Sequence, residues 1–166
     1  MHTDTKTFQR DPKPAFWLFK TEPEEFSIDD LKRVGREPWT GIRNYQARNL
    51  LRDQAKVGDQ VFVYHSSCAV PGVVGVAEIV SASYPDPSQF DPNSDYYDPA
   101  SKPAEPRWLC LDVAYNRQLK RPLTLEQLKT AASLDGFLLL KRGNRLSLFP
   151  VPEQFADQLL NMEHAQ

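Results

Sequence analysis

The sequence predicts an α+β protein built as a partly closed β-barrel with short flanking helices. The 166-residue chain has 14 prolines against 7 glycines, which argues against a mostly helical fold and favours strands joined by rigid loops. Its apolar runs are short and have strand character, and its helix-start signals precede short segments. Short strands with small helices around them are typical of a barrel of this kind.

The chain length suits one compact domain, which we place at residues 15–163. Residues 1–14 are polar and contain no apolar stretch, so we expect a disordered leader there and no signal peptide. No run approaches the ~20 apolar residues that span a membrane. These features predict an intracellular protein that does not bind membranes.

The first half of the domain is expected to alternate strands and helices. Ala15–Lys20 is a short aromatic run with strand character. Ser27–Arg33 starts with a capping serine and ends on basic residues, as helices do. Asn44–Asp53 could be a short helix capped by its first residue, and Gln60–His65 follows as a strand.

In the second half, strands again precede short helices. Val73–Tyr84 predicts a strand, in which Gly75 marks a bulge or a close backbone approach. Arg107–Tyr115 predicts another strand. Thr124 opens a capping box and a short helix to about residue 132, and Pro152–Met162 predicts a closing helix.

The segment Pro85–Pro106 has no periodicity and contains six prolines. A structureless loop of ~20 residues is uncommon in a compact domain and is often a functional lid. It also carries aromatic residues, among them Tyr96 and Tyr97, which a solvated linker does not need. We therefore expect this loop to cover a site.

Charge is unevenly distributed along the chain, although the net charge is only -2. Residues 32–56 hold seven basic and two acidic residues, a net charge of +5, and residues 107–150 hold eight and three, again +5. Residues 86–105 between them hold one basic and five acidic residues, a net charge of -4. The two basic stretches could form one positive face that binds phosphates, or could be scattered solvated charge.

The most informative segment is Trp39–Asn49, which combines two aromatics, two arginines, two asparagines, a glutamine and a glycine. These residue types stack on flat rings, hold phosphates and read the hydrogen-bonding edges of bases. Trp39 could instead be a core residue, and Asn44 could simply cap a helix. Arg142–Ser147 repeats the same chemistry, although Gly143 and Asn144 could serve only to reverse the chain.

An enzymatic alternative would use His65 as a base with Ser66 or Cys68 as a nucleophile. Consecutive strand residues point to opposite faces, so His65 and Ser66 cannot form a ready dyad. Cys68 and Cys110, the two cysteines of the chain, are too distant in sequence to indicate a disulfide framework or a zinc site. We expect no catalysis, no metal and no cofactor.

Several of these segments together resemble the EVE domain family. The matching segments are Phe16–Pro23, Ser27–Leu31, Trp39–Asn49, Val57–Asp59, Tyr64–Ser66, Pro71–Glu78, Asp91–Pro99, Pro106–Trp108 and Arg142–Ser147. The resemblance implies a PUA-like fold, which is a mixed, mostly antiparallel β-barrel with short flanking helices, related to the YTH domain. It also implies a pocket that holds one extruded base between aromatic walls.

The resemblance further implies which residues form the site. The base-binding pocket would use Trp17, Lys20, Trp39, Asn44, Tyr45, Ser66 and Asn144. Phosphates would be held at its mouth by Arg43, Arg48, Arg142 and Arg145. A lid would be formed by Tyr96, Tyr97 and Asp98.

The function expected from this resemblance is nucleic-acid binding by capture of one flipped, modified base, with a modified cytosine in DNA as the first expectation. The alternatives are an RNA-binding module of a modification or translation complex, the enzyme described above, and a small-ligand or protein adaptor. We expect a monomer that is nuclear in a eukaryote, or cytoplasmic, with nucleoid association as an option, in a bacterium.

Overall fold

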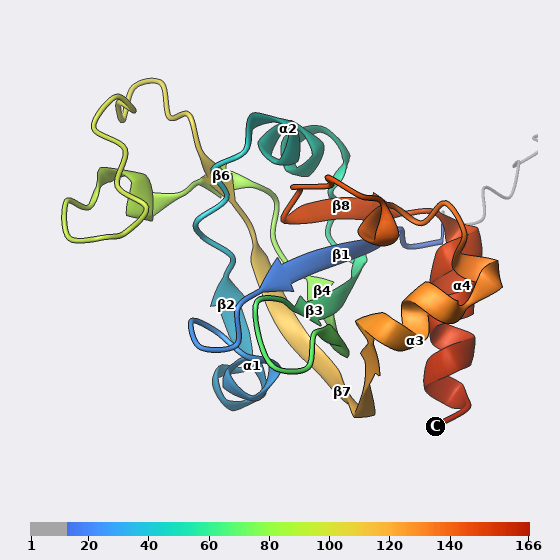
Figure 1. The fold of residues 1–166 in the computed structure, drawn as a ribbon. Helices are drawn as coiled ribbons and strands as arrows, with labels where there is room; N and C mark the ends of the chain where they lie inside the picture. Colours follow the sequence, from blue (N-terminus) through green and yellow to red (C-terminus); the bar gives the residue numbers. More distant parts are fainter. Residues whose placement is uncertain (1–12) are drawn as a thin grey trace, which may run out of the picture.

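The computed structural model of the protein describes residues 13–166 (Figure 1). Most of the predicted leader, residues 1–14, lies outside the described residues. The strands are β1 (Phe16–Thr21), β2 (Arg36–Pro38), β3 (Gln60–His65), β4 (Gly72–Ile79), β5 (Tyr84–Pro85), β6 (Leu109–Cys110), β7 (Asp112–Thr124) and β8 (Leu148–Val151). The α-helices are α1 (Ile28–Val34), α2 (Tyr45–Gln54), α3 (Leu125–Thr130) and α4 (Glu153–His164), and three short 3₁₀ turns complete the structure.

Six strands form one sheet in the order β2-β7-β4-β3-β1-β8, and β5 pairs with β6 in a separate two-stranded sheet. In the large sheet β1 and β3 are parallel and every other neighbouring pair is antiparallel. The sheet curls into a half-barrel, with helices packed around it (Figure 1). The predicted α+β class, with a mixed and mostly antiparallel sheet, is confirmed.

The core lies along the central strands, which are buried on both faces. In β1, Trp17, Leu18 and Phe19 are each at most 1% exposed. The indole N–H of Trp17 donates to Asp59 Oδ2 at 3.0 Å, so its polar atom is satisfied inside the protein. Strand β3 is likewise buried at residues 61–64.

The helix caps predicted from the sequence are confirmed. Ser27 and Asp30 form a reciprocal capping box at the start of α1, and Thr124 and Gln127 form one at α3. The Asn44 side chain accepts a hydrogen bond from the Ala47 N–H at 3.0 Å and caps α2. In each case the side-chain oxygen satisfies a backbone donor that the first turn leaves free.

Gly75 in β4 shows the close backbone approach predicted for it. A Cβ atom at this position would lie 2.5 Å from Ile28 Cδ1 and 2.8 Å from the carbonyl oxygen of Arg117. The register between β4 and β7 shifts beside it. Because Gly75 has no side chain, Ile28 of α1 and the backbone of β7 can both lie close to β4.

The two edge strands, β2 and β8, were not predicted from the sequence. Each is short and contains a proline, Pro38 in β2 and Pro150 in β8. Proline lacks the N–H that a central strand needs, but an edge strand leaves part of its backbone unpaired. The predicted strand at residues 107–115 is in fact two strands, β6 and the first part of β7.

The long loop at residues 85–106 is not structureless. Gln89 is fully buried, and its amide nitrogen donates to the carbonyl oxygens of Asp86 and Trp108 at 2.7 and 2.8 Å. Its amide oxygen accepts from the Ser101 hydroxyl and the Trp108 N–H. One buried side chain therefore ties both ends and the middle of the loop together.

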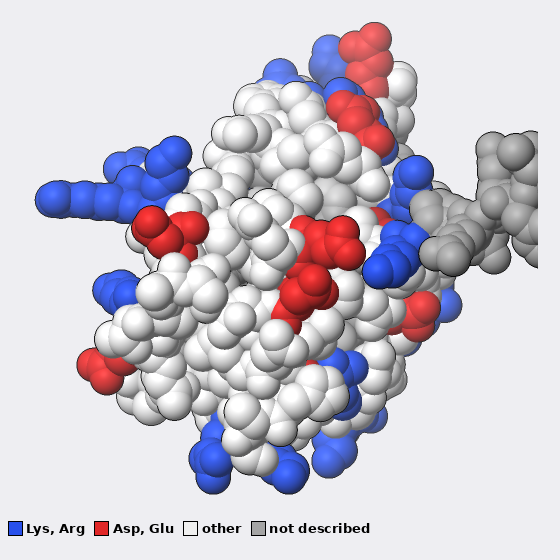
Figure 2. All heavy atoms as spheres, turned by 90° about the vertical axis from the view of Figure 1, so that its right-hand side faces the viewer, with Lys and Arg blue, Asp and Glu red and all other residues white. Residues whose placement is uncertain are grey.

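Charges of both signs are interspersed on the side of the molecule where α4 lies (Figure 2). A single positive field does not cover this face. Among residues 13–166, no helix combines the length and the apolar character that crossing a bilayer requires.

Candidate functional site

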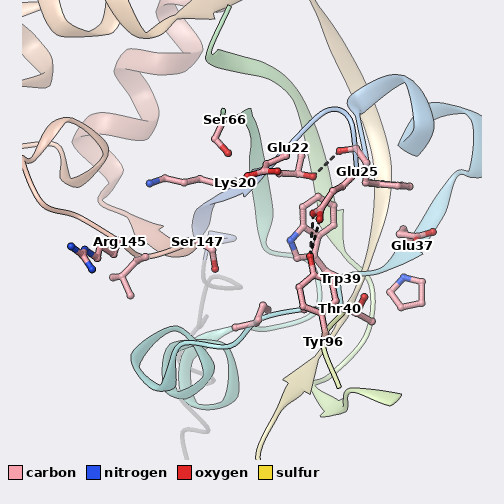
Figure 3. Close-up of a pocket in the computed structure, with 16 residues that line it drawn as sticks. Lys20, Glu22, Glu25, Glu37, Trp39, Thr40, Ser66, Tyr96, Arg145 and Ser147 are labelled. Atoms are coloured by element: carbon pink, nitrogen blue, oxygen red, sulfur yellow. Dashed lines mark hydrogen bonds between the residues drawn. The ribbon is translucent and has the colours of Figure 1, made fainter. Parts of the chain in front are cut away.

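A pocket of about 680 Å³ opens where the chain leaves the end of β1. Its walls come from the β1 end and the following turn at residues 20–26, from β2 and the loop after it, and from Ser66, Tyr96 and residues 145–147. These segments are far apart in sequence but meet at one end of the half-barrel (Figures 1 and 3). The volume lies within the range of small-ligand sites.

Trp39 forms one wall of this pocket. Its backbone N–H donates to the Leu111 carbonyl at 2.8 Å, which continues the pairing of β2. Its ring packs against Phe19 at 5.7 Å and Phe26 at 6.0 Å between ring centroids. The indole is partly exposed and lines the pocket (Figure 3), so it is supported from behind and open to solvent in front.

Tyr96 from the long loop forms part of the same pocket. Its ring lies directly on Gly41, where a Cβ atom would be 2.7 Å from Tyr96 Cζ. Gly41 also has φ +87°, a conformation that other residues rarely adopt. The Tyr96 hydroxyl donates to Glu25 at 3.1 Å, so the ring is held at both ends.

Arg43 fastens this loop to the segment that carries Trp39. Its guanidinium donates to Asp86 Oδ2 at 3.0 Å, to the Ser88 hydroxyl, to the Ile42 carbonyl and twice to the Tyr96 carbonyl. These contacts use all five N–H groups of the side chain. The structure therefore leaves Arg43 no donor for a phosphate, contrary to the role predicted for it.

Asp86, the acidic partner of Arg43, is fully buried. Burial alone would raise its pKa, but hydrogen bonds from Ser88, the Gly41 N–H and Arg43 outweigh burial and hold the pKa below its ordinary value. The carboxylate is therefore ionised at neutral pH. We call Arg43 together with its acceptors in the loop, Asp86, Ser88 and the Tyr96 carbonyl, the Arg43 clamp.

The pocket is polarised in charge. Lys20 and Arg145 extend to one side of Trp39, whereas Glu37 lies on the other (Figure 3). Burial lowers the pKa of Lys20, and neither Lys20 nor Arg145 forms an ion pair within residues 13–166. This side offers two free cations, and the opposite side offers the carboxylate of Glu37.

Five of the residues predicted for the site line this pocket. They are Lys20, Trp39, Ser66, Tyr96 and Arg145. The structure does not bring the other predicted residues to its walls. Whether the five contact a base remains a prediction.

Three residues predicted for the pocket have other surroundings. Trp17 is sealed in the core, because its strand is covered on both faces. Asn44 caps α2. Tyr45 is 51% exposed and stacks on Trp108, with 4.7 Å between ring centroids.

Asn144 also lies outside the pocket walls. Its side-chain oxygen accepts from the Leu146 N–H at 3.1 Å and shapes the turn before β8. Its side-chain nitrogen is buried without a hydrogen-bond partner among the described residues.

The remaining residues predicted to hold phosphates or to form a lid also lie outside the pocket walls. Arg48 donates to Asn49 and to the Arg107 carbonyl and lies over the Tyr45 ring, whereas Arg142 is exposed. Asp98 accepts from the Trp108 indole N–H at 2.8 Å inside the loop. Tyr97 is 41% exposed and is not part of the pocket walls.

His65 has a role that the sequence did not reveal. Its Nε2 accepts a hydrogen bond from the Ile28 N–H at 3.1 Å, so this imidazole caps the start of α1. Burial lowers the pKa of His65 and favours the neutral form that accepts this bond, although Asp29 opposes the shift. Ser66 faces the pocket but His65 does not line it. Within residues 13–166 no cluster of three His, Cys, Asp or Glu side chains could hold a metal ion.

The sequence interpretation missed the acidic side of the pocket. Glu22, Glu25 and Glu37 line it, together with Phe26 and Thr40. Glu37 could have been found from its position two residues before Trp39, because alternate strand residues share a face. That signal depended on recognising β2 as a strand.

A half-barrel with an open, aromatic-walled pocket defines the class of protein as a ligand-binding module. The family model described as the EVE domain matches residues 15–162. The chain therefore belongs to the EVE domain family, and the resemblance seen in the sequence is confirmed.

Named relatives share most of this chain. Thymocyte nuclear protein 1 of Mus musculus is 39% identical over 183 residues, which covers 98% of this chain and 80% of the relative. A solved protein of Pseudomonas syringae is 44% identical with a TM-score of 0.86, covering 90% of this chain and 99% of that one. The human THYN1 protein, solved in complex with DNA containing 5-methylcytosine, is 40% identical with a TM-score of 0.84, covering 90% and 97%.

Proposed function

We propose that this protein binds DNA and captures a single modified cytosine, turned out of its stack, in the pocket walled by Trp39. The observation that carries the proposal is the indole of Trp39, which is packed from behind and open to a solvent-accessible pocket in front. The human relative solved with 5-methylcytosine-containing DNA supports the choice of ligand.

The energetics of capture are favourable on general grounds. Turning a base out of its stack costs a few kcal/mol. Stacking on an aromatic ring returns about 1–3 kcal/mol per base, and hydrogen bonds to the pocket add to this. One methyl group changes binding by about 1–3 kcal/mol, so preference for a methylated base should be tens- to hundreds-fold.

Lys20 and Arg145, with Arg142 in the same turn as Arg145, are the cations that would hold the DNA backbone. Lys20 and Arg145 line the pocket, and Arg142 is exposed. Every residue in this proposal comes from one chain, so a monomer is sufficient. The protein would act where DNA is, in the nucleus of a eukaryote or the cytoplasm of a bacterium.

Binding without catalysis fits the surroundings of His65. Its Nε2 is occupied by the Ile28 N–H, and its ring does not line the pocket. His65 is therefore not placed to act as the base for Ser66. Turnover of labelled nucleic acid that disappears in His65→Ala would instead support the enzymatic alternative.

The proposal is tested by replacing the indole. We expect Trp39→Ala to lose the preference for 5-methylcytosine over cytosine, because the stacking surface is gone. Trp39→Phe keeps an aromatic ring and should retain part of the preference. Fluorescence anisotropy with short duplexes that differ in one methyl group gives the affinities, and circular dichroism verifies the fold.

Tyr45→Ala is the matched control, because Tyr45 is an exposed aromatic residue outside the pocket walls. Its preference for the methylated base should equal that of the wild type. RNA of matched sequence belongs in the same panel. Equal or tighter binding of RNA would favour the RNA-binding alternative, and an unchanged preference in Trp39→Ala would remove Trp39 from the site.

A further inference from the structure

The carboxylates of the pocket are not equivalent. Glu22 and Glu25 are exposed, and Glu25 accepts a hydrogen bond from the Tyr96 hydroxyl. Glu37 is half-buried and forms no side-chain hydrogen bond or ion pair within residues 13–166. Of the three, Glu37 is the least exposed to water, and its carboxylate oxygens are free to accept hydrogen bonds.

The position of Glu37 relative to the stacking wall follows from the strand. Glu37 lies in β2, and the backbone of Trp39 continues the pairing of that strand with its neighbour. Residues two apart on a strand point to the same side, about 6–7 Å apart. Both residues line the pocket, and Figure 3 shows Glu37 on the side of Trp39 away from Lys20 and Arg145.

This arrangement fixes an orientation for a bound nucleotide. In a nucleotide bound as proposed above, the phosphate would be attracted to the side of Lys20 and Arg145, and the heterocycle would stack on Trp39 with its far edge toward Glu37. A carboxylate accepts hydrogen bonds but cannot donate them when ionised. The exocyclic group that meets Glu37 must therefore be a donor.

We propose that Glu37 makes the pocket selective for a base with an exocyclic amino group, so that 5-methylcytosine is accepted and thymine is rejected. The inference rests on the proposed function, because it concerns the same pocket. Cytosine presents its N4 amino group as a donor, and Asp or Glu is a recognised acceptor for it. Thymine carries the same 5-methyl group but presents its O4 oxygen there, which a carboxylate repels.

The surroundings of Glu37 agree with this role. Burial and the nearby charge of Asp112 raise the pKa of Glu37. When the pocket is empty, no donor or positive charge in the described part of the chain pairs with its ionised carboxylate. An amino group would supply that compensation through a charge-assisted hydrogen bond. A pocket that recognised only a methyl group would need no such acceptor.

The experiment compares 5-methylcytosine with thymine, since the two bases share their methyl group and differ in the exocyclic group that Glu37 is proposed to meet. Each base is placed opposite an abasic site in otherwise identical duplexes, so neither has a partner to lose on leaving the stack. We expect the wild type to prefer 5-methylcytosine by about ten-fold or more. Glu37→Gln should bring the two affinities close together, because an amide can turn to donate or accept.

Glu24→Gln is the matched control, because Glu24 is an exposed carboxylate that does not line the pocket. It should keep the wild-type preference. Glu37→Asp retains the charge and should keep the direction of the preference with weaker binding, and circular dichroism verifies that the variants fold.

The outcomes separate this inference from the proposed function. A wild type that prefers 5-methylcytosine to cytosine but binds thymine equally well overturns the role of Glu37 and leaves DNA binding intact. If Glu37→Gln keeps the wild-type preference for 5-methylcytosine over thymine, the proposed role of Glu37 is also overturned. A wild type that binds none of the duplexes overturns the proposed function itself.

Discussion

At the scale of single residues, Gly41 controls how closely the long loop approaches the pocket. Its φ of +87° and the Tyr96 ring lying on it leave no room for a side chain. Its N–H also donates to Asp86 at 2.9 Å. One glycine therefore allows the backbone, the ring and the buried carboxylate to meet.

We expect Gly41→Ala to destabilise the protein by about 2–4 kcal/mol, since the new Cβ both strains the backbone and displaces Tyr96. It should also weaken DNA binding, because Tyr96 lines the pocket. Urea unfolding measures the stability and anisotropy the affinity.

Gly58→Ala is the control for backbone strain alone. Gly58 has φ +96°, but a Cβ atom there has no neighbour within 4 Å. Gly58→Ala should lower the free energy of unfolding by about 1–2 kcal/mol and leave DNA binding unchanged. Equal effects of the two substitutions would show that contact with Tyr96 is unimportant.

Two tryptophans predicted for the pocket show what residue type alone leaves open. Trp17 lies in β1 and Trp39 follows β2, and both were predicted to contact the base. Trp17 is sealed in a strand covered on both faces, whereas Trp39 follows an edge strand and has one free side. The difference lies in the place of each strand in the sheet, which pairing between distant segments decides.

At the scale of elements, the loop between β5 and β6 is tied to the rest of the domain by several contacts. The Arg43 clamp holds it to the segment before α2, and Gln89 ties it internally. The β5–β6 pairing closes its base. Movement of this loop as a lid would have to break a buried ion pair.

Removing one charge of that pair should therefore be costly. We expect Asp86→Asn to lower the free energy of unfolding by about 3 kcal/mol, since it leaves Arg43 without its buried partner. The loss should be accompanied by weaker binding, because Tyr96 is positioned by the same clamp. Urea unfolding at neutral pH measures the free energy of unfolding.

Asp53→Asn is the comparison for an ion pair at the surface. Asp53 pairs with Arg52, and both side chains are about half exposed. Exposed pairs contribute little, so the unfolding free energy should stay nearly unchanged. If both substitutions behaved alike, the clamp would not be what holds the loop.

The elements that the sequence predicted well are those with local signals. Capping residues located the starts of α1, α2 and α3, because a cap bonds to the backbone of its own helix. Strands β2 and β8 were missed because short, proline-containing edge strands lack periodicity. The acidic side of the pocket was missed with β2.

At the scale of the whole molecule, the net charge of -2 gives no general attraction to DNA. Binding has to depend on where individual cations lie. All N–H groups of Arg43 donate to protein acceptors, and Arg48 is largely bound to protein acceptors as well. Arg145, in contrast, lines the pocket without an ion pair in the described part of the chain. Arginines close together in sequence thus have different roles.

We expect Arg145→Ala to weaken binding to every duplex alike and to reduce the slope of log affinity against log salt concentration by about one, because one phosphate contact is lost. The preference for 5-methylcytosine should persist. Arg52→Ala, which removes an arginine paired with its neighbour Asp53, is the control and should leave the slope unchanged. A slope that does not change in Arg145→Ala would exclude a phosphate contact there.

The sequence by itself determined the fold class, the helix caps, the family and Trp39 as a wall candidate, because these depend on local chemistry or on whole segments shared with relatives. Only the tertiary structure decided which aromatic residues line the pocket, which arginines remain free and which carboxylates lie on its walls. Those outcomes depend on contacts between segments distant in sequence, such as Arg43 with Asp86. A side chain's type states what it can bind, and its partners in the folded chain decide whether it is free to do so.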